Sequence, residues 1–154
     1  MNVYFSDEQD LGVDSTEMLR FAERVLEEEG LPPKTEMAVL LVGPDQMADY
    51  NERFMGNGGP TDVLAFPVED LEPGFIPTIS KDEPPLNLGD VFLCPSEIHT
   101  RALDEGVDSD DLLFHLMAHG ILHLLGYDHG EDDQAVQMER REDDLLKMIG
   151  RSPA

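Results

Sequence analysis

Apolar residues recur along the chain with two different periods. Short apolar runs bounded by turn residues are typical of strands, and apolar residues spaced three and four apart are typical of amphipathic helices. The expected strands are 2–6, 36–42, 61–66 and 88–93. The expected helices run from Asp14 to the stop at Gly30, from Pro44 through Phe54, from Pro95 through Glu105, from Asp108 through Leu125, and from Asp132 to Met148.

One of these helices is apolar on nearly all sides. Its body, Leu112–Leu125, follows an N-cap and first-turn acids at residues 108–111. A helix of this kind lies in the centre of a core. We therefore expect a single α+β domain, residues 1–154, in which a small mixed β-sheet packs against several helices with this one in the middle. The proline-rich, acidic segment at about 67–87 is expected to be an excursion across the surface, because neither flank is long enough to fold alone.

The charge of the chain is extreme. Acids outnumber Lys and Arg by 34 to 10, for a formal net charge of -24. A dispersed acidic surface is typical of adaptation to high salt, where counterions screen the self-repulsion, and it is equally compatible with a merely acidic, very soluble protein. In either case the charge opposes binding to a polyanion unless local cations or a metal ion offset it.

The sequence also bears on the compartment. Residues 1–7 contain no basic region and no long apolar run, which argues against a secretory signal. No stretch approaches the roughly 20 apolar residues that span a bilayer. Cys94 is the only cysteine, so no intramolecular disulfide can form. We expect a cytoplasmic protein with no membrane association.

Three histidines have the spacing of metal ligands. His119 and His123 are four residues apart on the apolar helix, so both imidazoles can face one ion. Gly126 suits the left-handed residue that ends a helix, and the following turn can return His129 to the same ion. Three imidazoles with one open position are the arrangement of a catalytic zinc site, although imidazole also suits nickel, copper and iron.

The remaining histidines differ from these three. His115 lies one turn before His119, about 6 Å along the axis at 1.5 Å per residue. It is a candidate for contacting substrate, for carrying a proton, or for orienting a ligand, and direct ligation together with the other three is not expected. His99 lies in a polar helix segment and is expected to have no special role.

The spacing of the histidines also matches that of metzincin peptidases. In those enzymes a Glu follows the first histidine and acts as the general base, whereas Gly120 occupies that position here. A zinc peptidase is therefore the second hypothesis. A third is a ribosome assembly factor without catalytic activity, whose metal only holds the fold.

Several segments together resemble the YbeY family of bacterial metal-dependent endoribonucleases. The segment from His119 to His129 resembles the family signature, Pro60–Pro67 is similar to its Pro-Thr-Asp-Val-Leu-Ser-Phe-Pro segment, and Leu88–Val91 is similar to its Leu-Gly-Asp-Ile strand. The resemblance spans about residues 36–146. It implies cleavage of single-stranded RNA with one zinc ion, maturation of ribosomal RNA at the 16S 3′ end, ribosome quality control, and partners on the small ribosomal subunit.

One position departs from the family. Many members carry an Arg five residues before the Pro of Pro-Thr-Asp, and Met55 stands there in this chain. That Arg is a natural phosphate ligand, so Arg53 becomes a candidate for binding substrate if the local turn allows it.

The general base is left open. Asp62 and Asp128 are candidates because they lie in motif segments, although Asp128 also suits a turn or a contact behind the ligands. Thr61 and Asp62 are expected either to bind substrate or to make hydrogen bonds at the end of a strand. Asp90, after Gly89, is expected in a structural turn. The acidic run 139–144 is expected to form a solvated helix face.

Overall fold

Four strands and five helices form one α+β domain, as expected. The computed structural model describes all residues from Met1 to Ala154. Its elements are β1 (Asn2–Glu8), α1 (Ser15–Glu28), β2 (Thr35–Val42), α2 (Pro44–Met55), β3 (Val63–Pro67), β4 (Leu86–Leu93), α3 (Pro95–Glu105), α4 (Ser109–Leu124) and α5 (Asp132–Met148).

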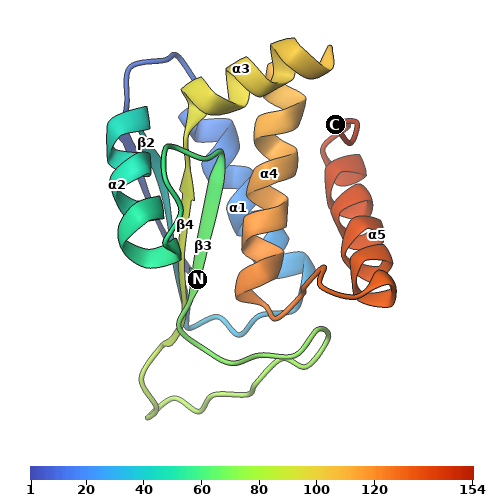
Figure 1. The fold of residues 1–154 in the computed structure, drawn as a ribbon. Coiled ribbons are helices and arrows are strands. Elements are labelled where there is room, and N and C mark those ends of the chain that lie inside the picture. Colours follow the sequence, from blue (N-terminus) through green and yellow to red (C-terminus); the bar gives the residue numbers. More distant parts are fainter.

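The sheet is mixed, with the strand order β1-β2-β4-β3. β1 and β4 both pair with β2 in parallel, and β3 pairs with β4 in the antiparallel direction. β3 is therefore an edge strand, reached directly from α2. In Figure 1 this edge lies beside α4, the helix that carries His119 and His123.

The two faces of the sheet are covered unequally. Figure 1 shows α2 alone on one side of the strands and α1, α4 and α5 on the other, with α3 across one end. The main core, a cluster of 29 buried residues, fills the α4 side. The α2 side holds a smaller cluster of 5 buried residues. As expected, α4 is the central helix, and its N-cap Asp108 accepts a hydrogen bond from the backbone N of Asp111.

The ends of some strands differ from the expected ones, because backbone hydrogen bonds to a neighbouring segment extend a strand beyond its apolar residues. β4 begins at Leu86 rather than Leu88, since the backbone N of Leu86 donates to the carbonyl of Lys34. The expectation for Asp90 was wrong, because it lies inside β4 opposite Phe66. Gly89 before it has a φ of 116° and passes so close to β3 that a Cβ would lie 2.1 Å from the carbonyl oxygen of Phe66.

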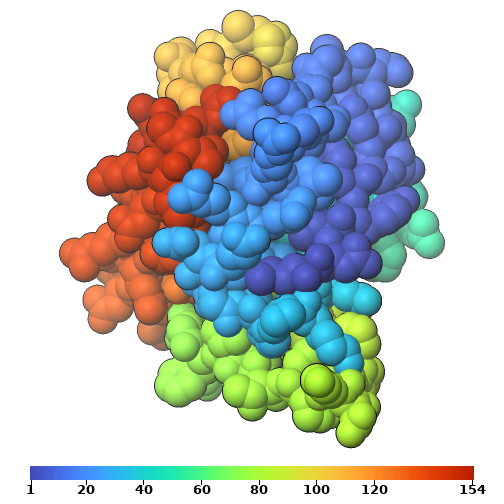
Figure 2. All heavy atoms as spheres, turned by 180° about the vertical axis from the view of Figure 1, so that it is seen from behind, coloured from blue at the N-terminus to red at the C-terminus, as the bar shows by residue number.

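Residues 68–85 contain no helix or strand beyond an isolated bridge between Glu72 and Phe75. They nevertheless pack against the main core through the half-buried side chains of Leu71, Ile76 and Ile79. In Figure 2 this segment, in green, closes the lower end of the molecule beneath α1. None of the five helices combines the length and the apolar character needed to cross a bilayer.

Candidate metal centre

His119 and His123 lie on the same face of α4, one turn apart. Their Nε2 atoms are 3.1 Å from each other, and their ring centroids are 4.6 Å apart. Burial and the neighbouring charges of His119 and His129 lower the pKa of His123. The neutral form of an imidazole, which is the form that binds metals, is therefore favoured at this position.

A tight turn after α4 brings back the third histidine. Gly126 has a φ of 97°, and the backbone N of Tyr127 donates to the carbonyl of Leu122 at 3.1 Å. The Asp128 carboxylate then accepts from the backbone N of His129 at 2.7 Å. Asp128 is exposed and serves this turn, and its side chain makes no hydrogen bond or ion pair with an imidazole.

The histidine cluster, defined as His119, His123 and His129, offers one ligand atom from each side chain. These atoms lie within 4.8 Å of one another. The ring of His129 is 5.4 Å from that of His119 and 5.1 Å from that of His123, measured between centroids. Three convergent imidazoles fit a divalent transition metal, so the cluster can hold a metal ion.

A buried glutamate lies directly behind this cluster. Glu142 on α5 is 3% exposed and accepts from His119 Nδ1 at 2.6 Å and from His115 Nε2 at 3.2 Å. A carboxylate can only accept, so the hydrogen of His119 is on Nδ1 and its Nε2 lone pair faces the cluster. A carboxylate that orients a ligand histidine in this way is common at protein metal sites.

The charge of Glu142 is retained despite burial. Burial alone would raise the pKa of this carboxyl, but hydrogen bonds from His115 and His119 and the charges of these rings lower it to about 2. The run 139–144 is therefore not a uniformly solvated face, and that expectation was wrong at Glu142. The missed signal was its spacing, four residues after the buried Met138 and three before the buried Leu145.

His115 stands behind Glu142 and outside the histidine cluster. The backbone N of Ala154 donates to its Nδ1 at 3.0 Å, so its Nε2 carries the hydrogen that Glu142 accepts. The hydrogen bond to Glu142, working against burial, raises the pKa of His115. His115 also lines the hollow that reaches the cluster, with both of its ring nitrogens engaged by Glu142 and the backbone of Ala154.

The packing around Gly120 explains why the residue after His119 carries no side chain. A Cβ there would lie 2.7 Å from Cγ1 of Val91 and 3.3 Å from Cγ2 of Val63. α4 therefore packs directly on β3 and β4 at this point, and a glutamate in this position would collide with the sheet. The arrangement that supplies the base in metzincins does not fit here.

Asp62 is held at the mouth of a hollow of about 410 Å³ that also includes His119 and His129. Its Oδ2 accepts from Arg101 Nη1 at 2.6 Å, and its Oδ1 accepts from the backbone N of Val63 at 2.7 Å. Both oxygens of Asp62 are thus already hydrogen-bonded within the protein. The hydroxyl of Thr61 lies 3.5 Å from Oδ1, at the same strand end.

Arg101 is a second residue that sequence reasoning missed. It comes from α3, 39 residues away from Asp62 in the chain, and its hydrogen-bond donors also include Nε, which reaches Glu105 at 3.0 Å. These two carboxylates, Asp62 first, raise the pKa of its guanidinium. No sequence motif links α3 to the hollow, so only the fold could place this cation there.

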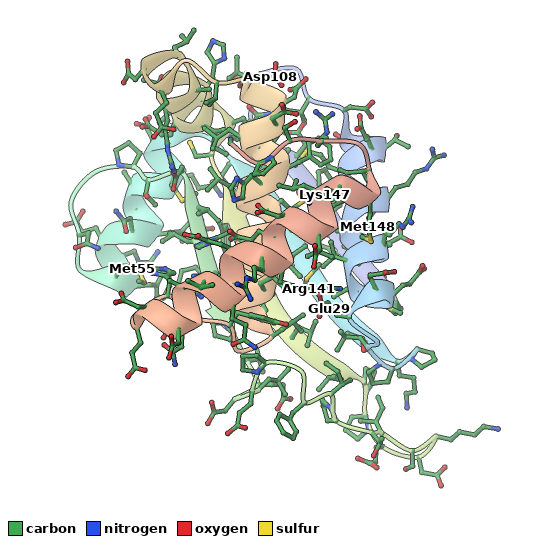
Figure 3. All side chains as sticks on the ribbon, turned by 90° about the vertical axis from the view of Figure 1, so that its right-hand side faces the viewer. Glu29, Met55, Asp108, Arg141, Lys147 and Met148 are labelled. Carbon is green, nitrogen blue, oxygen red and sulfur yellow. The ribbon has the colours of Figure 1, made fainter.

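Arg53 does not reach the histidine cluster. Its Nη1 pairs with Asp49 at 3.1 Å on the exposed side of α2, and its guanidinium lies 5.6 Å from the ring centre of Phe54. Met55 instead lines a second hollow, of about 370 Å³, together with the three histidines. Figure 3 shows Met55 at the end of α2. The side chain that the end of α2 contributes to this hollow is therefore apolar.

Comparisons with known proteins agree with this architecture. The family model described as "Endoribonuclease YbeY" matches residues 4–150. A protein of that name from Acidothermus cellulolyticus is 42% identical over 147 residues, covering 95% of this chain and 90% of the relative. Another from Salinispora tropica is 39% identical over 140 residues, covering 90% and 89%.

A solved structure shares the fold. The solution structure of a protein from Thermotoga maritima superposes with a TM-score of 0.59 at 22% identity, covering 96% of this chain and 91% of the other. At that identity the likeness concerns the fold alone. The family match and the two relatives carry the assignment further: the chain belongs to the endoribonuclease YbeY family.

Proposed function

We propose that this protein is a zinc-dependent endoribonuclease that cleaves single-stranded RNA, with His119, His123 and His129 as the metal ligands. The observation that carries the proposal is the geometry of the histidine cluster, with Glu142 fixing one ligand from behind. The family name supports cleavage of RNA. The packing of Gly120 against Val91 argues against the peptidase alternative.

Different residues of the chain have different roles at this site. When bound, zinc supplies a Lewis acid that activates water for attack on a phosphodiester and offsets negative charge in an acidic protein. Glu142 holds His119 in one orientation and tautomer. Arg101, held by Asp62, presents a positive charge to the hollow in which the scissile phosphate would lie. Thr61, next to Asp62, would offer its hydroxyl to substrate, and His115 would act through its hydrogen bond to Glu142.

The biological role belongs to the same proposal. Maturation of the 16S 3′ end, ribosome quality control, partners on the small ribosomal subunit and a cytoplasmic location are supported by membership of the family. Residues 1–154 are proposed to act as one domain, with 67–87 as an excursion within it.

Metal analysis combined with RNA cleavage tests the proposal. Zinc-loaded protein should cleave a single-stranded oligoribonucleotide and spare the matching duplex, and a chelator should abolish the activity. His119→Ala should remain folded by circular dichroism, bind little zinc and lose cleavage. The proposal is lost if His119→Ala or chelated protein cleaves at the wild-type rate. Cleavage of a peptide library by the zinc-loaded protein would restore the peptidase alternative.

A further inference from the structure

A hollow of about 340 Å³ opens on the α2 side of the sheet, at the point where α2 ends. Five residues line it: Tyr50, Phe54, Phe66, Asp90 and Phe92. Four of the five are aromatic, and none belongs to the histidine cluster. The inner rings are part of the small core on this face, but Phe54 is 59% exposed.

The rings form a connected aromatic shelf. Phe92 lies 4.6 Å from Tyr50 and 5.6 Å from Phe66 between ring centroids, and Phe66 meets Phe54 edge to face at 5.5 Å. The exposed ring of Phe54 is thus supported from within. An aromatic side chain that is held at the surface in this way is a typical platform on which a base of a single strand stacks.

A carboxylate stands at the rim of this shelf. Asp90 is exposed in the middle of β4, opposite Phe66, and its side chain makes no hydrogen bond or ion pair with another protein group. The guanidinium of Arg53 lies 5.6 Å from the ring centre of Phe54 and pairs with Asp49. A base that stacks on this face of Phe54 would displace the guanidinium towards its own backbone phosphate. A stacking surface, an acceptor and a cation are the three parts that a nucleotide requires.

The aromatic shelf is continuous with the candidate metal centre across the β3 edge. Met55 follows Phe54 in the chain, and Ala65 and Pro67 flank Phe66. Met55, Ala65 and Pro67 all line the hollow that contains the three histidines. A single RNA strand that crosses the edge of β3 would therefore meet both sites.

We propose that the aromatic shelf binds one base of the RNA substrate and prefers guanine. An ionised carboxylate is acceptor-only, with two oxygens. Guanine alone among the four bases presents two adjacent donors, N1–H and N2–H₂, on one edge, so it matches both oxygens of Asp90. Adenine, cytosine and uracil each offer one donor group on that edge. The inference rests on the proposed function for its ligand, RNA.

The test uses the zinc-loaded full-length protein and tetranucleotides that differ only in one base, read by fluorescence anisotropy, with the integrity of each strand checked after the titration. Wild type should bind the guanine-containing strand about tenfold more tightly than the all-uracil strand, a factor in the range of one bidentate contact to a base. Asp90→Asn should remove that preference and leave uracil binding within twofold. Phe54→Ala should weaken binding of every strand about tenfold, as loss of a stacking ring does.

Matched variants separate the site from general effects. Phe75→Ala removes another ring, 72% exposed, and Asp82→Asn removes another exposed acid, so both should leave binding unchanged. Phe54→Tyr should restore binding. Equal affinity for all four bases in wild type, a preference that survives Asp90→Asn, or equal losses in Phe54→Ala and Phe75→Ala would each overturn the inference. The inference would also be overturned if Phe54→Ala changed only the self-association of the protein and not RNA binding, because the aromatic shelf would then be a contact between two copies of the chain.

The cleavage of RNA and the binding of guanine on the aromatic shelf can be tested separately. If wild type binds the guanine strand through Asp90 but cleaves no RNA with zinc, the proposed function is lost and the shelf stands. If wild type cleaves RNA and shows no dependence on Asp90 or Phe54, the function stands and the shelf is lost.

Discussion

Glu142 on α5 accepts a hydrogen bond from His119 on α4 at 2.6 Å, across a separation of 23 positions in the sequence. Glu142→Gln keeps the size of the side chain but removes the charge that holds the His119 tautomer. We expect zinc affinity to fall about 10–100-fold, the usual effect of losing such a partner. Competition with a chromophoric chelator measures this. Glu139→Gln, an exposed neighbour on the same helix, is the control, and equal affinities in the two variants would contradict the role of Glu142.

Gly120 permits the close contact between α4 and the sheet. Gly120→Ala places a methyl group 2.7 Å from Cγ1 of Val91. The overpacking should lower the free energy of unfolding by about 1–3 kcal/mol, which exceeds the gain in helix propensity of up to about 1 kcal/mol. Urea unfolding of metal-free protein measures the change. Gly12→Ala, in open space, should be nearly neutral, and Val91→Ala should partly rescue Gly120→Ala.

Gly126 combines a left-handed backbone with a close approach. A Cβ there would lie 2.0 Å from the carbonyl oxygen of Leu71, so Gly126→Ala should cost at least about 2 kcal/mol of unfolding free energy and displace His129. Gly106 shares the left-handed conformation with nothing within 4 Å of a Cβ. Gly106→Ala therefore isolates the backbone term, and only Gly126→Ala should also weaken zinc binding. Identical losses in both variants would show that the Leu71 contact contributes nothing.

Arg101 is the cation that lines the hollow beside His119. Arg101→Gln should raise KM for single-stranded RNA several-fold and reduce by about one the slope of log affinity against log salt, because one phosphate contact is lost. Steady-state cleavage at several salt concentrations measures both quantities. Arg20→Gln removes an exposed arginine from α1, and it should change neither. A lower kcat with KM unchanged would instead point to a role in the chemical step.

The net charge of -24 predicts a response to salt. The Debye length shrinks from about 10 Å at 0.1 M to about 3 Å at 1 M, so repulsion among surface acids is screened. The free energy of unfolding should therefore rise over this range in potassium chloride, and cleavage should survive or rise. Chemical denaturation by urea at each salt concentration is the measurement. A sharp optimum at low salt would contradict adaptation to high salt.

The sequence predicted the elements and the convergence of the three histidines because both depend on short spacings. Every helix and strand was found from apolar periodicity, and the histidine cluster from a span of eleven residues with a helix-ending glycine. These features are local, and tertiary packing only adjusted their ends, as at Leu86. The mixed sheet and the central helix followed from the same pattern.

The surroundings of the cluster could not be found in this way. Arg101 and Asp62 meet only because α3 crosses one end of the sheet beside β3, which no local spacing encodes. Glu142 could not be told apart from the other acids of the run 139–144, since composition alone does not show which acidic side chain faces the core. Arg53, chosen for its charge, points away because the helical turn that carries it pairs it with Asp49.

α5 is also tied to the C-terminal end of α1. Arg141 forms an ion pair with Glu29, and Figure 3 shows the two residues side by side. The helix that supplies Glu142 is thus held from both of its sides.

The carbonyl of Leu71 rests against Gly126, and this contact joins the irregular segment 68–85 to the turn that carries His129. Surface segments of this kind usually tolerate change in length and sequence. Here a proteolytic nick or an insertion near Leu71 would disturb the turn that carries His129 and so cause a loss of bound zinc, although no residue of the segment belongs to the histidine cluster. Metal occupancy could therefore serve as a sensitive reporter of damage in a part of the chain that contributes no chemistry.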